Sequence, residues 1–230
     1  MSEPKYLVWD VESSGTDVFN DRIVQLFVAT ADEDGNLIDT HEWIINPGIE
    51  IPEEASNIHG YTTEFLRENG VEPHRALWEA DLIFKEAVRQ KLILVAYNAN
   101  FDMSILTAEM ARNALGSGYG VWIADNTAVA DALVIDRAKD RYRKGKRKLE
   151  NLAAHYGVPF DPEKAHDAAY DVEITAKVTA AVIRKYGLPT NGEQAQYYAE
   201  WARSYEDWLH SQGKTDIIDT SWPVRKKESA

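Results

Sequence analysis

The sequence predicts an α/β protein: a mixed five-stranded sheet flanked by helices, with a helical extension at the C-terminus. Three strand-like segments come first and are joined by short turns, which favours an antiparallel meander. Strand-like and helix-like segments then alternate, which favours a mixed sheet covered by helices. The 230 residues suffice for one sizeable core but are short for two.

The strand predictions follow from short apolar runs. Residues 6–9 (YLVW) suit a buried first strand, and residues 22–30 (RIVQLFVAT) suit a second. An Asp-Gly-Asn turn then leads into a third strand over residues 37–45. Residues 92–96 (LILVA) predict a central strand, and a further strand or extended piece is expected between residues 121 and 129.

The helix predictions follow from apolar residues at intervals of three and four. One such stripe covers residues 77–88, and Asn100 is the predicted N-cap of a helix that ends near residue 115. Four further helices are predicted, over residues 131–141, 148–156, 167–186 and 192–212. The Pro- and Glu-rich residues 47–60 are expected to form a loop. We therefore divide the chain into a domain of residues 1–188 and a C-terminal helix and tail of residues 189–230.

The composition narrows the chemistry. The chain has no cysteine, so a metal site must use oxygen and imidazole ligands, which favour hard ions such as Mg²⁺ or Mn²⁺. A net charge of −13 argues against non-specific coating of nucleic acid, but not against an enzyme that holds one strand end through metal ions. The N-terminus lacks the apolar core of a signal peptide, and no apolar run is long enough for a membrane span. We therefore expect a cytoplasmic protein with no membrane partner.

Three groups of polar residues carry candidate chemistry. Asp10 and Glu12 are two apart in a strand, so both carboxylates point to one face, where a divalent cation would relieve their repulsion. Asp102 lies in the first helical turn after the central strand, where active sites of such sheets form. Asp171 lies in the first turn of the long helix, and His166 precedes it in a loop. Taken alone, each has a plainer interpretation as a solvated charge, a helix-dipole partner or a loop histidine.

Their combination and order resemble the DnaQ-like exonucleases of the DEDDh type, a family that includes the proofreading epsilon subunit of bacterial DNA polymerase III. The matching motifs are D-x-E on strand one, N-x-x-F-D after the central strand and H-x-A-x-x-D at the start of the long helix. Residues 52–60, which end in I-H-G, and residues 146–152 agree with the same family. The resemblance spans about residues 5–186. Tyr97 departs from it, because the epsilon subunit has a histidine there.

The resemblance implies an RNase H-like fold and a metal-dependent 3′-to-5′ exonuclease that releases nucleoside monophosphates from DNA. The implied catalytic residues are Asp10, Glu12, Asp102, His166 and Asp171. Two divalent ions, Mg²⁺ or Mn²⁺, would lie among the four carboxylates. Asp10, Glu12 and Asp171 would hold the first ion, Asp10 would bridge to the second, and Asp102 would act mainly through a water ligand. His166 would take the proton of the attacking water, a role that suits an imidazole.

The resemblance also implies substrate contacts and partners. The implied substrate-binding residues are Thr16, Glu54, His59 and Phe101. The expected partners are single-stranded DNA or the 3′ ends of DNA, with RNA as an open alternative because no motif reports on the 2′-hydroxyl. A second alternative is a proofreading or accessory subunit that mainly binds a DNA polymerase through the aromatic residues of 189–230. A third is a catalytically inactive relative, which the presence of all five catalytic positions disfavours.

Residues 137–148 (RAKDRYRKGKRK) form a basic run in this acidic chain, with eight lysines and arginines. One interpretation is a solvated helix and loop, the common fate of such a run. The other is an edge beside the active site that follows the phosphates of a strand without reading its sequence. The sequence leaves both open.

Overall fold

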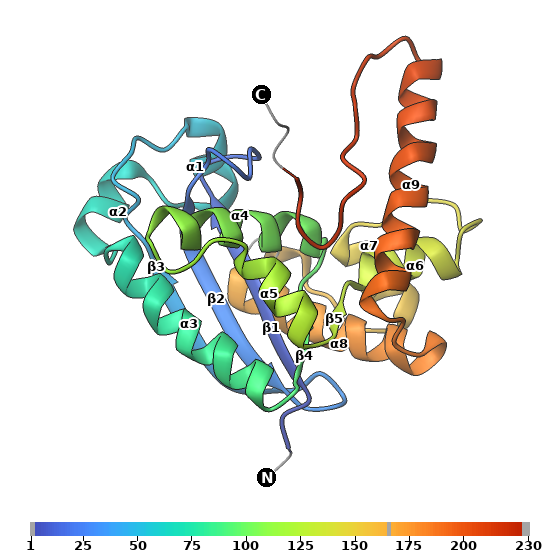
Figure 1. Cartoon of the computed structure of the whole chain (residues 1–230), viewed down its shortest axis with the longest axis horizontal. Helices are drawn as coiled ribbons and strands as arrows, with labels where there is room; N and C mark the ends of the chain where they lie inside the picture. The colour runs from blue at the N-terminus through green and yellow to red at the C-terminus, as the bar shows by residue number, and fades with distance from the viewer. Residues whose placement is uncertain (1–2, 165–166, 227–230) are drawn as a thin grey trace.

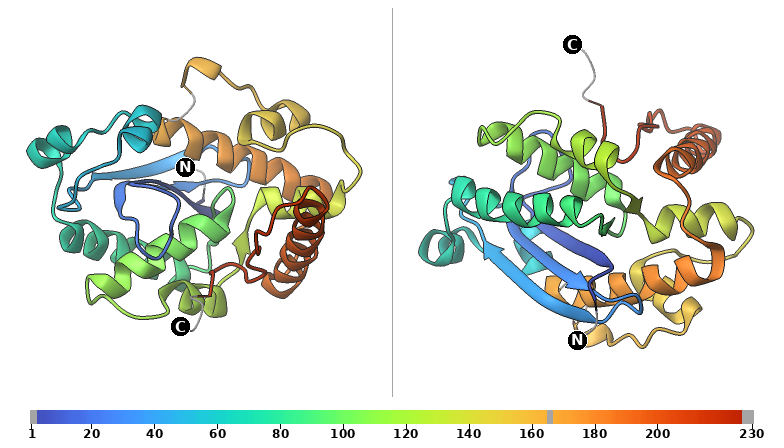
Figure 2. Two further views of the ribbon diagram at one scale, coloured as in Figure 1. Left: turned by 90° about the horizontal axis from the view of Figure 1, so that it is seen from above. Right: turned by 60° about the horizontal axis from the view of Figure 1, so that its bottom comes forward.

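The computed structural model describes residues 3–164 and 167–226, and its centre is a mixed sheet with helices on both faces (Figures 1 and 2). The strands are β1 (Tyr6–Ser13), β2 (Ile23–Ala31), β3 (Leu37–Ile44), β4 (Ile93–Val95) and β5 (Val129–Ala130). Their spatial order is β3-β2-β1-β4-β5. β1, β2 and β3 pair antiparallel, whereas β1, β4 and β5 run parallel. The predicted fold class is confirmed.

The helices alternate with strands and then follow them. They are α1 (Glu53–His59), α2 (Thr63–Asn69), α3 (Pro73–Arg89), α4 (Ala99–Arg112), α5 (Tyr119–Asn126), α6 (Ala132–Lys139), α7 (Leu149–Tyr156), α8 (Ala168–Tyr186) and α9 (Asn191–Ser211), with a 3₁₀ turn at Pro162–Lys164. Within the described residues, none of these helices combines the length and apolarity needed to cross a membrane.

The alternation of side chains along β1 decides which helices cover which face. Leu7 and Trp9 are buried in one core cluster together with α3, α4 and α5. Tyr6 and Val8 point the other way and pack with α8. Asp10 continues the register of Tyr6 and Val8, so the strand delivers its carboxylates toward the start of α8.

α8 lies close to the sheet because its facing residues are small. Ala168, Val172, Ala176 and Ala180 recur every four residues and form the stripe that packs on the strands. The β2–β3 turn also touches this helix: Gly35 has φ +83°, and a Cβ there would lie 2.6 Å from the backbone of Ala176. Only glycine fits this turn without strain.

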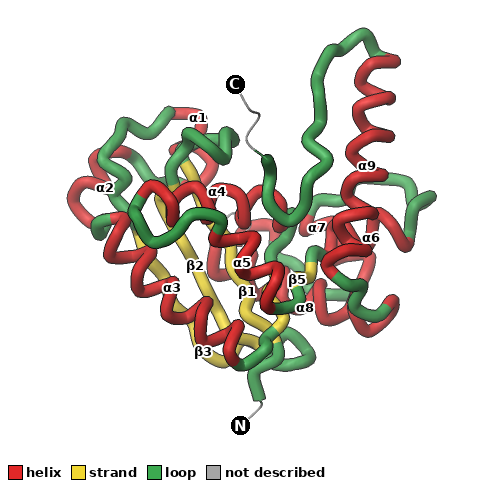
Figure 3. The backbone as a smooth tube through the Cα atoms, viewed as in Figure 1, coloured by secondary structure: helices red, strands yellow, loops and turns green. Residues whose placement is uncertain are grey.

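The C-terminal part of the chain returns to the sheet domain. α9 packs against α6, and its Tyr198 and Ala202 are buried in the core cluster that includes α4. The chain then runs back alongside α9 toward α4 (Figure 3), where Trp222 is buried in the same cluster. The division at residue 188 stays a prediction.

Two amide side chains of α9 complete the hydrogen bonds of β5, the strand at one edge of the sheet. Asn191 accepts a hydrogen bond from the backbone N–H of Val129 at 2.8 Å. Gln194 donates from Nε2 to the carbonyl of Val129 at 2.6 Å. The outer edge of β5 is therefore paired by side chains in place of a sixth strand.

Three local predictions were wrong. The predicted loop at residues 47–60 contains α1, which ends at Gly60 in the left-handed conformation. The extended piece expected between residues 121 and 129 is mostly α5, and only its end belongs to β5. α4 begins two residues earlier than predicted: its N-cap is Asn98, at φ 62°, whereas Asn100 lies inside the helix.

Candidate active site

The carboxyl ends of the three parallel strands meet at one edge of the sheet, and carboxylates follow each of them. Asp10 and Glu12 lie near the end of β1. Asp102 occupies the first turn of α4, after β4, and Asp131 is the N-cap of α6, after β5. Asp171 lies in the first turn of α8. The four predicted carboxylates therefore come from three elements that converge on this edge.

These carboxylates act on one another electrostatically. The pKa of Asp10 is raised well above its usual value, first by burial and then by the charges of Asp102, Glu12 and Asp171. Burial, followed by the charge of Asp171, raises the pKa of Glu12 to about 7. Like charges that raise one another's pKa lie close together in a medium that screens them poorly.

The pKa of Asp102 is raised as well. Burial is the largest cause of its raised pKa, and the charges of Asp131 and Glu12 add to it. Backbone N–H groups, including that of Val11, lower the pKa of Asp102 in part. These carboxyl groups are thus buried together at the edge of the sheet, where their ionised forms repel one another.

The donor set fits hard divalent cations. It consists of carboxylate oxygens, which are the ligands of Mg²⁺ and Mn²⁺, and a cation would offset the repulsion that raises these pKa values. The oxygens are not drawn tightly together: among the described residues, these carboxylates do not form a group of three with ligand atoms within 4.8 Å of one another.

A pocket of about 530 Å³ opens beside these carboxylates. Its lining includes Glu12 and all four of the predicted substrate-binding residues. Thr16 comes from the loop after β1, Glu54 and His59 from α1, and Phe101 from α4. The residues come from segments far apart in the sequence, and the fold places them around one cavity next to a candidate metal ligand.

His59 is held in a defined orientation within this pocket. Its Nδ1 accepts a hydrogen bond from the backbone N–H of Tyr61 at 3.1 Å. Burial is the largest influence on its pKa and lowers it, so the ring is neutral at pH 7. With Nδ1 occupied, the proton of a neutral imidazole lies on Nε2, which is buried in this structure.

His166, the predicted general base, lies outside the described residues. Its neighbour Asp167 is described, and it is the N-cap of α8: its side chain accepts a hydrogen bond from the backbone N–H of Tyr170 at 2.9 Å. This cap fixes the start of the helix that presents Asp171.

Asp131 is a residue of this edge that the sequence analysis did not single out. Its carboxylate accepts hydrogen bonds from the backbone N–H groups of Asn98, at 3.2 Å, and Ala99, at 2.9 Å, and also from Leu133 in its own helix, at 3.0 Å. It thereby ties the segment before α4 to the start of α6. The available signal was an aspartate between a short apolar strand and a helical stripe, which is an N-cap pattern.

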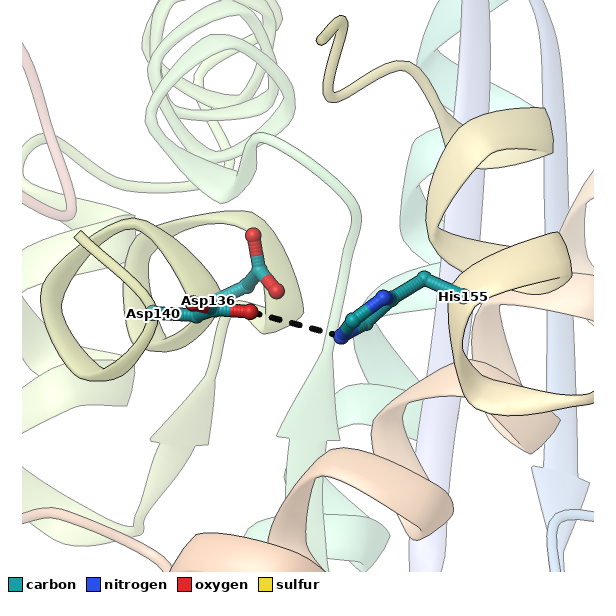
Figure 4. Close-up of side chains that lie close together, drawn as sticks. All are labelled: Asp136, Asp140 and His155. Carbon is teal, nitrogen blue, oxygen red and sulfur yellow. Dashed lines mark ion pairs between the residues drawn. The ribbon is translucent and has the colours of Figure 1, made fainter. Parts of the chain in front are cut away.

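A second group of possible metal ligands lies away from this edge (Figure 4). Within the described part of the chain, Asp136 of α6, Asp140 at the C-cap of α6 and His155 of α7 bring one ligand atom each within 4.8 Å of one another. His155 and Asp140 form an ion pair at 3.4 Å, from Nε2 to Oδ2. Spacing alone would allow a cation here.

The partners of Asp136 argue against that use. Its Oδ2 accepts hydrogen bonds from Arg143, at 2.6 Å, and Arg147, at 2.7 Å, and its Oδ1 accepts one from the hydroxyl of Tyr156 at 2.7 Å. Asp136 is fully buried, and two guanidinium groups already supply its counter-charge. We therefore interpret this group as a structural ion-pair network, which also anchors two arginines of the basic run.

Known proteins share this sequence pattern and this fold. The model of the RNase T exonuclease family matches residues 7–179. The PolC-type DNA polymerase III of Staphylococcus haemolyticus is 32% identical over 185 residues, which is 80% of this chain and 12% of that polymerase. The PolC-type DNA polymerase III of Pediococcus pentosaceus is 27% identical over 200 residues, 85% of this chain and 13% of that polymerase. The chain thus spans only about an eighth of these curated relatives.

Solved structures agree on the fold. Exonuclease I from Methylocaldum szegediense superposes with a TM-score of 0.65 at 21% identity, over 86% of this chain and 45% of that one. An exonuclease I–single-stranded DNA complex from E. coli, in its zinc-bound form, gives a TM-score of 0.64 at 19% identity, over 91% and 45%.

Together, the sheet order and the carboxylate edge are those of a DnaQ-like exonuclease domain. The chain belongs to the RNase T exonuclease family, since the family model covers most of its length. The predicted resemblance and the predicted enzyme class, an exonuclease-family hydrolase, are confirmed.

Proposed function

We propose that this protein is a metal-dependent 3′-to-5′ exonuclease that hydrolyses the terminal phosphodiester bond of DNA and releases nucleoside monophosphates. The observation that carries the proposal is the set of mutually acting carboxylates beside a pocket of nucleotide-like size. DNA is favoured as substrate because the curated relatives are DNA polymerases and the structural relative from E. coli was solved with single-stranded DNA. A DNA polymerase as partner and a cytoplasmic location belong to the same proposal.

The proposed metal site uses the four carboxylates. Asp10, Glu12 and Asp171 would hold one divalent ion, Asp10 would share a second, and Asp102 would act through a water ligand. When bound, Mg²⁺ or Mn²⁺ would acidify the attacking water and offset the charge on the phosphate and on the leaving 3′ oxygen. The raised pKa values of Asp10 and Glu12 support this role, because a site that repels its own charges gains most from a cation.

The proposed substrate pocket holds the terminal nucleotide. Phe101 offers a ring against which a base can stack, and His59 lines the same cavity, where it would contact the terminal nucleotide. Glu54 is exposed at the mouth of the same pocket and would contact the sugar hydroxyl of the strand end. These contacts would orient the last phosphodiester bond toward the carboxylates. An enzyme accelerates a reaction when it holds the reacting groups in the correct geometry.

His166 is the proposed general base. The hydrolysis forms a bond from the water oxygen to phosphorus while the bond to the 3′ oxygen of the preceding nucleotide breaks. His166 would take the proton of the water, and the 3′ oxygen would acquire one from solvent.

The test compares strands that carry a label at the 3′ end: single-stranded DNA, duplex DNA and RNA of one sequence. We expect Mg²⁺ or Mn²⁺ to support release of labelled nucleoside monophosphate from DNA, and EDTA to abolish it. Asp10→Asn should be inactive, whereas Asp39→Asn, an exposed carboxylate on β3, should behave like the wild type. Full activity in excess chelator would contradict the metal mechanism, and preferential release from RNA would reassign the substrate.

A further inference from the structure

α9 carries a row of aromatic rings along one face. Tyr198, Trp201, Tyr205 and Trp208 follow one another at helical spacing. The rings of Trp201 and Tyr205 are nearly parallel at 5.5 Å between centroids, and those of Tyr205 and Trp208 at 5.7 Å. Tyr198 is buried, whereas Tyr205 is 39% and Trp208 52% exposed. The row therefore begins in the core and ends in solvent.

Three rings of this row, those of Tyr198, Trp201 and Tyr205, line a groove of about 990 Å³ together with basic side chains. The groove lies between α9, the C-terminal segment and the basic run. Its charged lining residues are Arg137, Arg147, Lys148 and Arg225 against the single acidic Asp219. The guanidinium of Arg137 lies 3.7 Å from the centroid of the Trp201 ring, so one lining cation packs directly on the aromatic row.

The groove reaches the segment from which α4 starts. Tyr97 and Asn98 line it, and Asn98 is the N-cap of α4. Phe101, three residues further on, lines the pocket beside the carboxylates. A strand that leaves the pocket past the start of α4 therefore meets the groove next.

The charge of the groove is opposite in sign to the net charge of the protein. The chain carries a net charge of −13, yet the groove has four basic residues and one acidic one. Asp136 and Asp140 together balance Arg143 and Arg147, so the excess positive charge of the groove lining comes from Arg137, Lys148 and Arg225 against Asp219. A positive groove on an acidic protein favours an anionic ligand.

Unpaired nucleic acid fits both features at once. Its phosphates match the basic wall, and its exposed bases can pack on aromatic rings regardless of sequence. A duplex would satisfy only the charges, because its bases are stacked and paired inside the helix. A protein partner would use the rings but would have to supply an acidic surface as well.

We infer that this groove between α9 and the basic run binds the single strand behind the 3′-terminal nucleotide. The inference rests on the proposed exonuclease function and adds a binding site to it: a groove outside the active site that holds several nucleotides of the unpaired strand. The aromatic row contacts the bases, and Lys148 and its neighbours contact the phosphates.

The test measures strand binding in EDTA, where the proposed mechanism allows no hydrolysis. The probe is a fluorescent thymidine oligonucleotide of about a dozen nucleotides, beside an abasic strand of equal length. Trp201→Ala and Tyr205→Ala should each weaken binding of the thymidine strand by about fivefold or more and leave the abasic strand nearly unaffected. The matched control is Trp78→Ala on α3, since Trp78 is 49% exposed and lies outside the groove.

Charge is tested separately. Lys148→Gln should flatten the salt dependence of binding for both strands, and Lys5→Gln, an exposed lysine before β1, should not. Cleavage of a dinucleotide, which is too short to reach the groove, should be unchanged in all of these variants.

Two failures are distinguishable. If Trp201→Ala and Tyr205→Ala bind the thymidine strand as the Trp78→Ala control does, the groove assignment is wrong, whatever the catalytic activity. If the wild-type chain cleaves no nucleic acid, the exonuclease proposal fails, and the binding contrast still decides the groove.

Discussion

Arg225 donates a hydrogen bond from Nε to Oδ1 of Asn100 at 2.7 Å and so joins the C-terminal segment to the first turn of α4. The same asparagine donates to the carbonyl of Ser221 at 2.7 Å, and its Oδ1 also accepts from the hydroxyl of Tyr198 at 3.2 Å. Asn100 is fully buried and lies two residues before Asp102. The tail is therefore part of what fixes the position of a candidate metal ligand.

Arg225→Ala should lower both stability and turnover. Loss of a hydrogen bond from a charged donor costs about 1.5–3 kcal/mol of unfolding free energy. Turnover of a dinucleotide should fall severalfold with little change in KM, because the turn that carries Asp102 loses a restraint. Chemical denaturation and steady-state kinetics measure the two effects.

The control for this change is Arg203→Ala, an exposed arginine on α9, which should leave both quantities unchanged. A stability loss with normal turnover would mean that the contact between Arg225 and Asn100 supports the fold alone.

The metal-free protein should lose stability as the pH rises from about 4.5 to about 7. The folded protein holds the Glu12 proton up to a pKa of about 7, whereas the unfolded chain releases it near 4.5. Between these two pH values the folded state therefore binds more protons than the unfolded state. The resulting stabilisation of the folded protein, about 3 kcal/mol, is complete below about pH 4.5 and lost above about pH 7. The raised pKa of Asp10 acts in the same direction.

Melting temperatures in EDTA across this window measure the effect. Glu12→Gln should flatten the pH dependence, and Mg²⁺ should weaken it in the wild type by compensating the carboxylate charge. An equal slope in the Glu12→Gln variant would show that Glu12 is not the group responsible.

Asp136→Ala should destabilise the protein without touching catalysis. Removing the acceptor leaves Arg143 and Arg147 without their shared carboxylate and Tyr156 without its acceptor, which costs about 3–5 kcal/mol for a buried pair. Asp140→Ala, at a partly exposed position, should cost about 1 kcal/mol or less. If either variant instead lost metal-dependent activity while remaining folded, this group would be a functional cation site.

His166→Ala should reduce the rate by about 10²–10⁴-fold while substrate affinity changes little, because the carboxylates still hold the ions. Wild-type activity should rise with pH through about 6 to 7 as the imidazole loses its proton. The variant has to be compared over the same pH range, since a water ligand also titrates there. Near-normal rates at every pH would remove His166 from the mechanism and with it the DEDDh assignment.

The fold class and the succession of strands and helices along the chain were predictable because both depend on local patterns. Apolar runs predicted the strands, and parallel strands place whatever follows them at one edge. The long helix α8 was predicted within one residue at its start, since Asp167 is a cap signal and the apolar stripe is regular.

The features that the sequence did not predict are short helices and contacts between residues far apart in the chain. α1 has seven residues and only Ala55 buried, so it has no apolar stripe to detect. α5 contains a short apolar run that fits a strand equally well. Asn100 looks like an N-cap in sequence, but its partners Ser221 and Arg225 are more than a hundred residues away and leave no local signal.

The side-chain amides that line the edge of β5 have a consequence for how the chain tolerates being cut. Asn191 and Gln194 belong to α9, so a chain ending at residue 188 would leave one side of β5 without these partners. Such a chain would still contain the proposed catalytic residues, which all precede residue 188. An uncovered strand edge is a template on which another molecule can add a strand. Such a fragment would be inclined to associate with itself, and a proteolytic nick ahead of α9 would threaten solubility before it threatened chemistry.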